Sequence, residues 1–89
     1  MQRDVEFFCG AELELVYIAK RLSDALALEK ALTEDGVDYM VETDTYMGGL
    51  LFRRELTGAF FYVAPGAAES VREIMSRRGY KPYVAEGNS

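Results

Sequence analysis

The sequence contains no histidine, no tryptophan, one cysteine and two prolines in 89 residues. Histidine is the side chain that most often moves protons near neutral pH and ligates transition metals, so its absence removes the common routes to both. It also excludes Ser-His-Asp and Cys-His catalytic sets. A single cysteine cannot form a disulfide within the chain, so the cysteine content does not indicate an oxidising compartment, and we expect a cytoplasmic protein. Because acids surround Cys9, we expect its thiol to be unreactive.

Long apolar runs and excess positive charge are also lacking. No apolar run approaches the roughly 20 residues that cross a bilayer, and the acidic start of the chain does not resemble a secretory signal. Fifteen acidic residues against ten basic ones give a net charge of −5. A negative chain repels polyphosphate, which disfavours nucleic acid as a partner. We therefore expect no membrane association, cofactor or metal, and no enzymatic activity.

What is present is the composition of one small globular domain, with 49% apolar and 28% charged residues. We expect tails over residues 1–12 and 86–89 around a single domain over 13–85. Hydrophobic spacing and turn residues predict two helices, one from an N-cap at Ser23 to Gly36 and one from Pro65 to Gly79. The predicted strands are 13–19, 37–44, 59–64 and 80–85, while residues 50–57 fit either a strand extension or a long loop.

A faint internal repeat relates the two halves of this β-α-β-β-α-β order. The helix openings at Ser23 and at Gly66, beside Pro65, lie 43 residues apart, as do the helix-ending glycines Gly36 and Gly79. Two such units predict an α+β, ferredoxin-like sandwich, in which both helices cover one face of a four-stranded antiparallel sheet. Strands 13–19 and 59–64 would be central. The acids of 37–44 and Pro82 in 80–85 suit edge strands.

The face of this sheet without helices is the first candidate site. Alternation along the strands, aligned by the repeat, predicts two sets of side chains. The core set is Val16, Ile18, Phe61 and Val63, and the open-face set is Tyr17, Phe60 and Tyr62. Three aromatics form a patch large enough to mark an interaction site. Either residues 45–57 or Phe7 and Phe8 fold over it, or a second copy binds there as a homodimer, or a small ligand or another partner does.

Two charged clusters are weaker candidates. Arg53 and Arg54 lie in the predicted 45–57 connection beside two glycines, where planar guanidinium groups could bind a carboxylate or phosphate. Asp38, Glu42 and Asp44 project from one predicted strand, but alternate strand residues lie about 6.6–7 Å apart and do not converge on one ion. We expect these acids to form a solvated edge.

Part of the sequence resembles a small bacterial family of PII-like signal-transducing proteins with ferredoxin-like domains. The similar segments are Val16–Ala19, Ser23–Ala25, Leu28, Leu32, Gly36–Val37, Val63–Pro65, Ala68–Glu69 and Val71–Met75. The resemblance covers about residues 13–79 and implies a cytoplasmic, often oligomeric module without established catalysis. In the PII proteins a long loop between the middle strands contacts partners. The 45–57 segment is similarly placed but much shorter, and the nucleotide-binding motifs are not recognisable.

A second resemblance is to the RNA-recognition motif. Residues 15–19 are similar to its first-strand aromatic motif, and residues 57–63 are a distant echo of its third-strand motif. In that register Tyr17 and Phe61 would face outward to stack on bases. Thr57 stands where a basic residue is expected and Ala59 where an aromatic is expected, and the whole chain is acidic.

These observations together predict a non-enzymatic regulatory or protein-interaction module that self-associates through an aromatic sheet face. The alternative is a sensor of a small anion or metabolite that uses the 45–57 connection. Binding of single-stranded RNA is the remote alternative.

Overall fold

The computed structural model of the protein describes residues 1–8, 10, 12–48 and 54–83. Their elements are η1 (Val5–Phe8), β1 (Glu14–Ala19), α1 (Leu22–Glu34), β2 (Met40–Gly48), β3 (Arg54–Val63), η2 (Pro65–Ala67) and α2 (Ala68–Arg77). The strands form one antiparallel sheet in the order β1-β3-β2. The mixed α+β class is therefore confirmed, with three strands in the part of the chain that is described.

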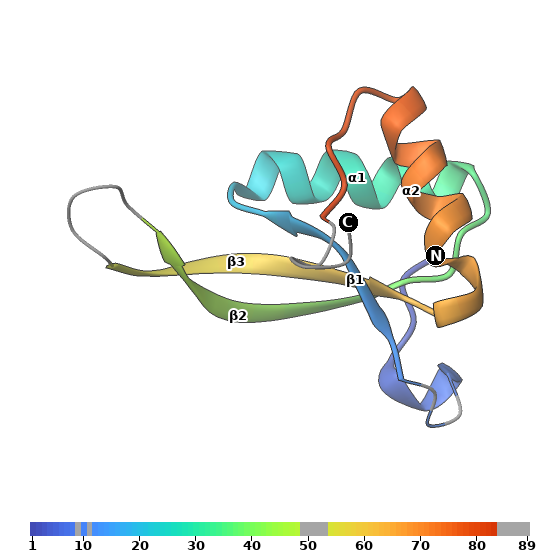
Figure 1. The fold of residues 1–89 in the computed structure, drawn as a ribbon, viewed down its shortest axis with the longest axis horizontal. Helices are drawn as coiled ribbons and strands as arrows, with labels where there is room; N and C mark the ends of the chain where they lie inside the picture. Colours follow the sequence, from blue (N-terminus) through green and yellow to red (C-terminus); the bar gives the residue numbers. More distant parts are fainter. Residues whose placement is uncertain (9, 11, 49–53, 84–89) are drawn as a thin grey trace.

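Both α-helices lie on the same side of the sheet (Figure 1). The core lies between them and the strands, and its most deeply buried members are Val16, Leu28, Leu32, Tyr39, Phe61, Val63, Val71 and Met75. Burying one such side chain stabilises the fold by roughly 1.5–3 kcal/mol relative to exposing it. The predicted core positions Val16, Phe61 and Val63 are confirmed.

The two helices end in the same way, as the glycine positions predicted. Gly36 and Gly79 adopt φ of 71° and 87°, a left-handed conformation that favours glycine. In each case the residue after the glycine donates its N–H to the carbonyl four residues before the glycine, at 2.9 Å. These bonds satisfy carbonyls that the helix leaves without intrahelical partners.

The repeat of 43 residues extends from these ends into the core. The equivalent buried pairs are Ala25 with Ala68, Leu28 with Val71, and Leu32 with Met75. The residues before the two glycines, Asp35 and Arg78, are themselves 43 residues apart and bind each other through two hydrogen bonds of 2.9 Å. The two halves therefore meet at equivalent positions.

A β-bulge in β1 overturns one part of the prediction. Leu15 lies opposite Tyr62, but Tyr17 lies opposite Phe61, so Val16 is an extra residue in β1. In a bulge two residues on one strand oppose one on its neighbour, and regular alternation is interrupted there. Tyr17 consequently packs against the core, and Ile18 lies opposite Phe60 on the other face. The predicted faces of Tyr17 and Ile18 were therefore wrong.

The start of α1 and the predicted last strand also differ from expectation. The N-cap is Arg21 rather than Ser23, and the Ala25 N–H donates to the Arg21 carbonyl at 3.1 Å. Residues 80–83 are not in a strand, although Tyr83 donates one backbone hydrogen bond to the Val16 carbonyl at 2.6 Å. Residues 84 and 85, also predicted as strand, lie outside the described residues.

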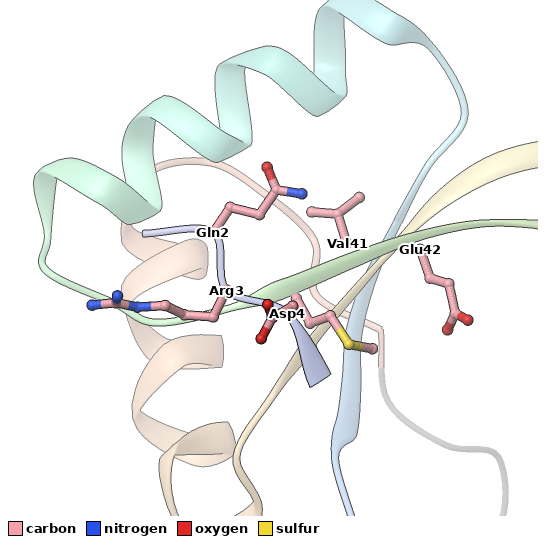
Figure 2. Close-up of a pocket in the computed structure, with 6 residues that line it drawn as sticks. Gln2, Arg3, Asp4, Val41 and Glu42 are labelled. Carbon is pink, nitrogen blue, oxygen red and sulfur yellow. The ribbon is translucent and has the colours of Figure 1, made fainter. Parts of the chain in front are cut away.

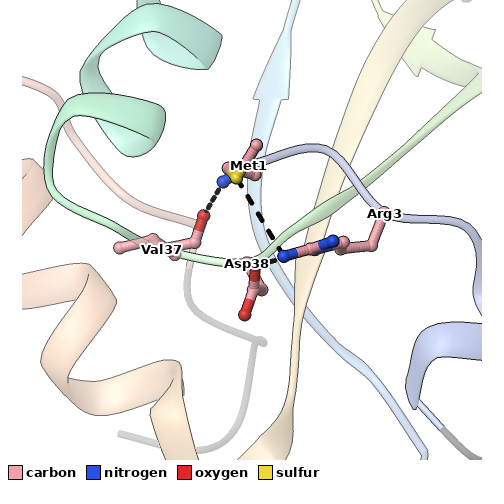
Figure 3. Close-up of polar contacts among 4 residues, drawn as sticks. All are labelled: Met1, Arg3, Val37 and Asp38. Atoms are coloured by element: carbon pink, nitrogen blue, oxygen red, sulfur yellow. Dashed lines mark hydrogen bonds and ion pairs between the residues drawn. The ribbon is translucent and has the colours of Figure 1, made fainter.

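The first residues of the chain pair with the segment that leads into β2. Gln2 forms a parallel bridge with Tyr39. The Tyr39 carbonyl accepts a 2.7 Å hydrogen bond from the Arg3 N–H, and the Tyr39 N–H donates to the Met1 carbonyl at 3.0 Å. Figure 3 shows two further contacts there, from the Met1 amino group to the Val37 carbonyl and from Arg3 to Asp38 at 2.9 Å. This segment therefore lies along the outer edge of the sheet.

Candidate functional site: the open face, the arm and the outer edge

The sheet surface opposite the helices is called the open face here. Register and alternation assign to it Leu15, Ile18, Met40, Phe60 and Tyr62, with Glu42 and Asp44 along one side. Phe60 and Tyr62 thus lie on the face where the sequence placed them. Phe60 is 9% exposed, and the other four apolar residues are half-buried. The open face is an apolar strip across three strands with an acidic border.

Tyr17 belongs to the helix side instead. Its ring meets Phe61 edge-on at 6.4 Å and Tyr80 edge-on at 5.7 Å between centroids. Burial raises the pKa of the Tyr17 hydroxyl, and the negative charge of Asp24 adds to this effect. Tyr17 therefore contributes to the packing between sheet and helices and not to the open face.

This placement also corrects the outward positions implied by the RNA-recognition resemblance. Base stacking would require Tyr17 and Phe61 on the open face. Phe61 is 0% exposed and packs on Tyr39 at 5.7 Å between centroids. Neither ring is available to stack on a base, because both point into the layer beneath the helices.

The acids of β2 border the open face. Glu42 lies opposite Phe60 and Asp44 lies opposite Gly58, and both carboxylates are exposed. Burial raises the pKa of the Tyr62 hydroxyl, and the charges of Glu42 and Asp44 raise it further. The negative potential of these acids therefore reaches the apolar strip.

The third predicted acid, Asp38, has a different environment. Its carboxylate forms an ion pair with Arg3 at 2.9 Å. The guanidinium carbon of Arg3 also lies 4.5 Å from the centre of the Phe7 ring. Within the described ranges, no three carboxylate side chains gather as a metal site would require. Asp38 thus holds the N-terminal segment, while Glu42 and Asp44 border the open face.

The far part of the β2–β3 hairpin forms an arm. β1 pairs with β3 only from Ala59 to Val63, whereas β2 pairs with β3 as far as Arg54. Residues 44–48 and 54–58 therefore form a two-stranded ribbon that projects beyond α1 (Figure 1). The segment that fitted either strand or loop is thus strand over residues 54–57. Sequence reasoning missed the arm because strand length beyond β1 depends on the register.

Of the two predicted anion-binding arginines, Arg54 is the first residue of β3. Arg53 lies outside the described residues, as does Cys9. Phe7 and Phe8, expected as one possible cover for the aromatics, line a cavity of about 390 Å³ together with Val71 and Ile74 of α2.

The outer edge of β2 carries a groove that the sequence did not reveal. It has a volume of about 610 Å³ and is lined by Gln2, Arg3, Asp4, Met40, Val41 and Glu42. Figure 2 shows that the N-terminal segment forms one wall and β2 the other. The groove begins where the N-terminal segment leaves the sheet.

Arg72 joins three parts of the chain beside β1. Its guanidinium donates to the Glu14 carboxylate at 3.1 Å, to the Leu15 carbonyl at 3.2 Å and to the Tyr83 carbonyl at 3.1 Å. Arg72 therefore holds residues 80–83 against the sheet.

Neither α-helix in the described part of the chain is long and apolar enough to span a membrane. No protein-family model, curated protein or solved structure matches this chain.

Proposed function

We propose that this protein is a non-enzymatic regulatory or protein-interaction module that self-associates as a homodimer through the open face. The observation that carries the proposal is the half-buried pair Ile18 and Tyr62, next to Phe60, on a face that neither helix covers. Apolar side chains gain free energy when a partner removes them from water, and a second copy offers the same strip.

The β-bulge strengthens this proposal relative to the sequence prediction. It replaces Tyr17 by Ile18 on the open face, so Leu15 and Ile18 of β1 lie opposite Tyr62 and Phe60 of β3. The exposed Glu42 and Asp44 lie at one side of it. An apolar centre with a charged border is the usual layout of a protein interface.

We further propose that the domain is ferredoxin-like, with residues 80–83 lying beside β1 in the place of a fourth strand. The bond from the Tyr83 N–H to the Val16 carbonyl and the Arg72 contacts support this arrangement. A bacterial, cytoplasmic module of the PII-like type fits the repeat and the single cysteine.

Sedimentation velocity at micromolar concentration tests the self-association. The wild type is expected to sediment as a dimer, and Ile18→Glu as a monomer, because the new carboxylate lies at the centre of the strip. Leu22→Glu is the matched control, since Leu22 is 74% exposed on α1 and should leave the dimer intact. A monomeric wild type, or loss of the dimer in Leu22→Glu alone, contradicts the proposal.

A further inference from the structure

The outer edge of β2 has backbone groups that point away from the sheet. Tyr39 uses both its N–H and its carbonyl to bind the N-terminal segment, so these groups face outward. Hydrogen-bonding direction alternates along a strand, so the N–H and carbonyl groups of Val41, Thr43 and Thr45 face outward too. The 2.8 Å bond from the Thr45 N–H to its neighbour's side chain, Asp44 Oδ1, agrees with this direction.

Two residues of that edge keep all their outward groups available. Among the described residues, the chain pairs with the outer edge only at the bridge of Gln2 with Tyr39. No described residue bonds to the outward N–H or carbonyl of Val41 or Thr43. The groove of about 610 Å³ opens beside Val41 and Glu42, so an incoming chain has access to this stretch (Figure 2).

The side chains along the outer edge of β2 are acidic, which affects the charge of any strand that could pair there. Glu42 and Asp44 are exposed and form no ion pair with the described residues, and exposed Asp4 lines the same groove. A strand placed beside β2 would have every second side chain next to these carboxylates. Lysine or arginine at those positions would be attracted.

A second copy of β2 fits this edge poorly. Antiparallel pairing of two β2 edges around Thr43 would set Glu42 against Asp44 of the other copy, and the neighbouring registers would also bring like charges together. The edge therefore favours a different chain, and its use does not depend on the dimer proposed above.

We propose that the outer edge of β2 binds an extended protein segment with lysine or arginine at alternate positions, which adds to the sheet as a further strand. Such strand addition obtains affinity from backbone hydrogen bonds and selectivity from alternate side chains. The bound strand would continue the edge pairing that residues 1–3 begin at Tyr39.

Amide hydrogen exchange and fluorescence anisotropy on the full chain test this, with a short synthetic peptide that alternates lysine and valine as the probe. The peptide should slow exchange at the Val41 and Thr43 amides. A peptide of the same pattern with glutamate in place of lysine should not bind. Binding of the lysine peptide without slower exchange at these two amides contradicts strand addition. Absence of binding also contradicts the proposal and would mean that the acids only protect the edge from pairing.

Two variants separate backbone pairing from general attraction. Thr43→Pro removes an outward N–H without removing a bond to β3, and should weaken binding by roughly tenfold. The double variant Glu42→Lys with Asp44→Lys should also weaken binding by at least about tenfold and should bind the glutamate peptide instead. The control Glu12→Lys with Glu69→Lys makes the same change in net charge at exposed positions elsewhere, and equal weakening by it would overturn the proposal.

Discussion

The base of the sheet and the arm are built from the same two strands but are stabilised differently. In the base, β3 lies between β1 and β2, and residues such as Phe61 are fully buried beneath the helices. In the arm, β2 and β3 pair only with each other, and Asp44, Thr45 and Thr57 are exposed. A two-stranded ribbon alone is marginally stable in water. Backbone pairing thus extends an element, whereas burial stabilises it, so the base should determine the stability of the whole chain.

The largest expected effect comes from removing a ring in the base. Phe61→Ala should lower the free energy of unfolding by about 3–5 kcal/mol, because it leaves a cavity in the buried core beside Tyr39. Urea denaturation followed by circular dichroism measures this change. Leu56→Ala in the arm is the matched truncation and should cost less than half as much, since Leu56 is half-buried. Equal losses would show that the arm is as tightly packed as the base.

A smaller effect is expected at the link between α2 and β1. Arg72→Met should lower the free energy of unfolding by about 1–3 kcal/mol, because the carbonyls of Leu15 and Tyr83 and the Glu14 carboxylate lose a charged donor. The control is Arg77→Met, which removes only an exposed i,i+4 pair with Glu73 and should cost about 0.5 kcal/mol or less. Similar costs for both variants would mean that Arg72 is not a structural link. The same denaturation measurement compares them.

The helix ends supply the smallest expected effect, which depends on pH. Hydrogen bonding to Arg78 lowers the pKa of the Asp35 carboxyl below its usual value of 3.8. A depressed folded-state pKa stabilises the fold above the unfolded value, and this contribution is lost as the pH falls through the folded value. The wild type should therefore be more stable than Asp35→Asn at neutral pH, and the difference should fade below pH 3.8.

Thermal unfolding of both proteins across this pH range measures the effect. An Arg78→Leu background serves as the control, because the carboxylate then lacks its partner and Asp35→Asn should have little effect at any pH. A pH-independent difference between the wild type and Asp35→Asn would assign the stabilisation to packing instead of charge.

The features that depend on neighbouring residues could be predicted from the sequence. Gly36 and Gly79 follow the helix ends as predicted, because a left-handed backbone favours glycine whatever the rest of the fold. The buried faces of both helices followed from apolar residues at helical spacing, as Leu28 and Leu32 show. These signals are local, so no knowledge of the sheet was needed.

The features that depend on pairing between strands could not be predicted in the same way. The bulge at Val16 reverses the faces of Tyr17 and Ile18, and neither residue type distinguishes a bulge from a regular strand. Contacts between residues 1–3 and 37–39 also join distant parts of the chain and depend on how the edge of the sheet is placed. Part of the candidate site, Phe60 and Tyr62, was placed correctly because β3 alternates regularly.

The Asp35–Arg78 contact has a consequence for how such a chain can be divided. The two residues occupy equivalent positions in the two halves of the repeat and are hydrogen-bonded to each other. If each half were a separate, identical molecule, that position would carry two carboxylates or two guanidinium groups, which repel at contact distance. Attraction there requires the halves to differ, and one continuous polypeptide guarantees that unlike halves always meet.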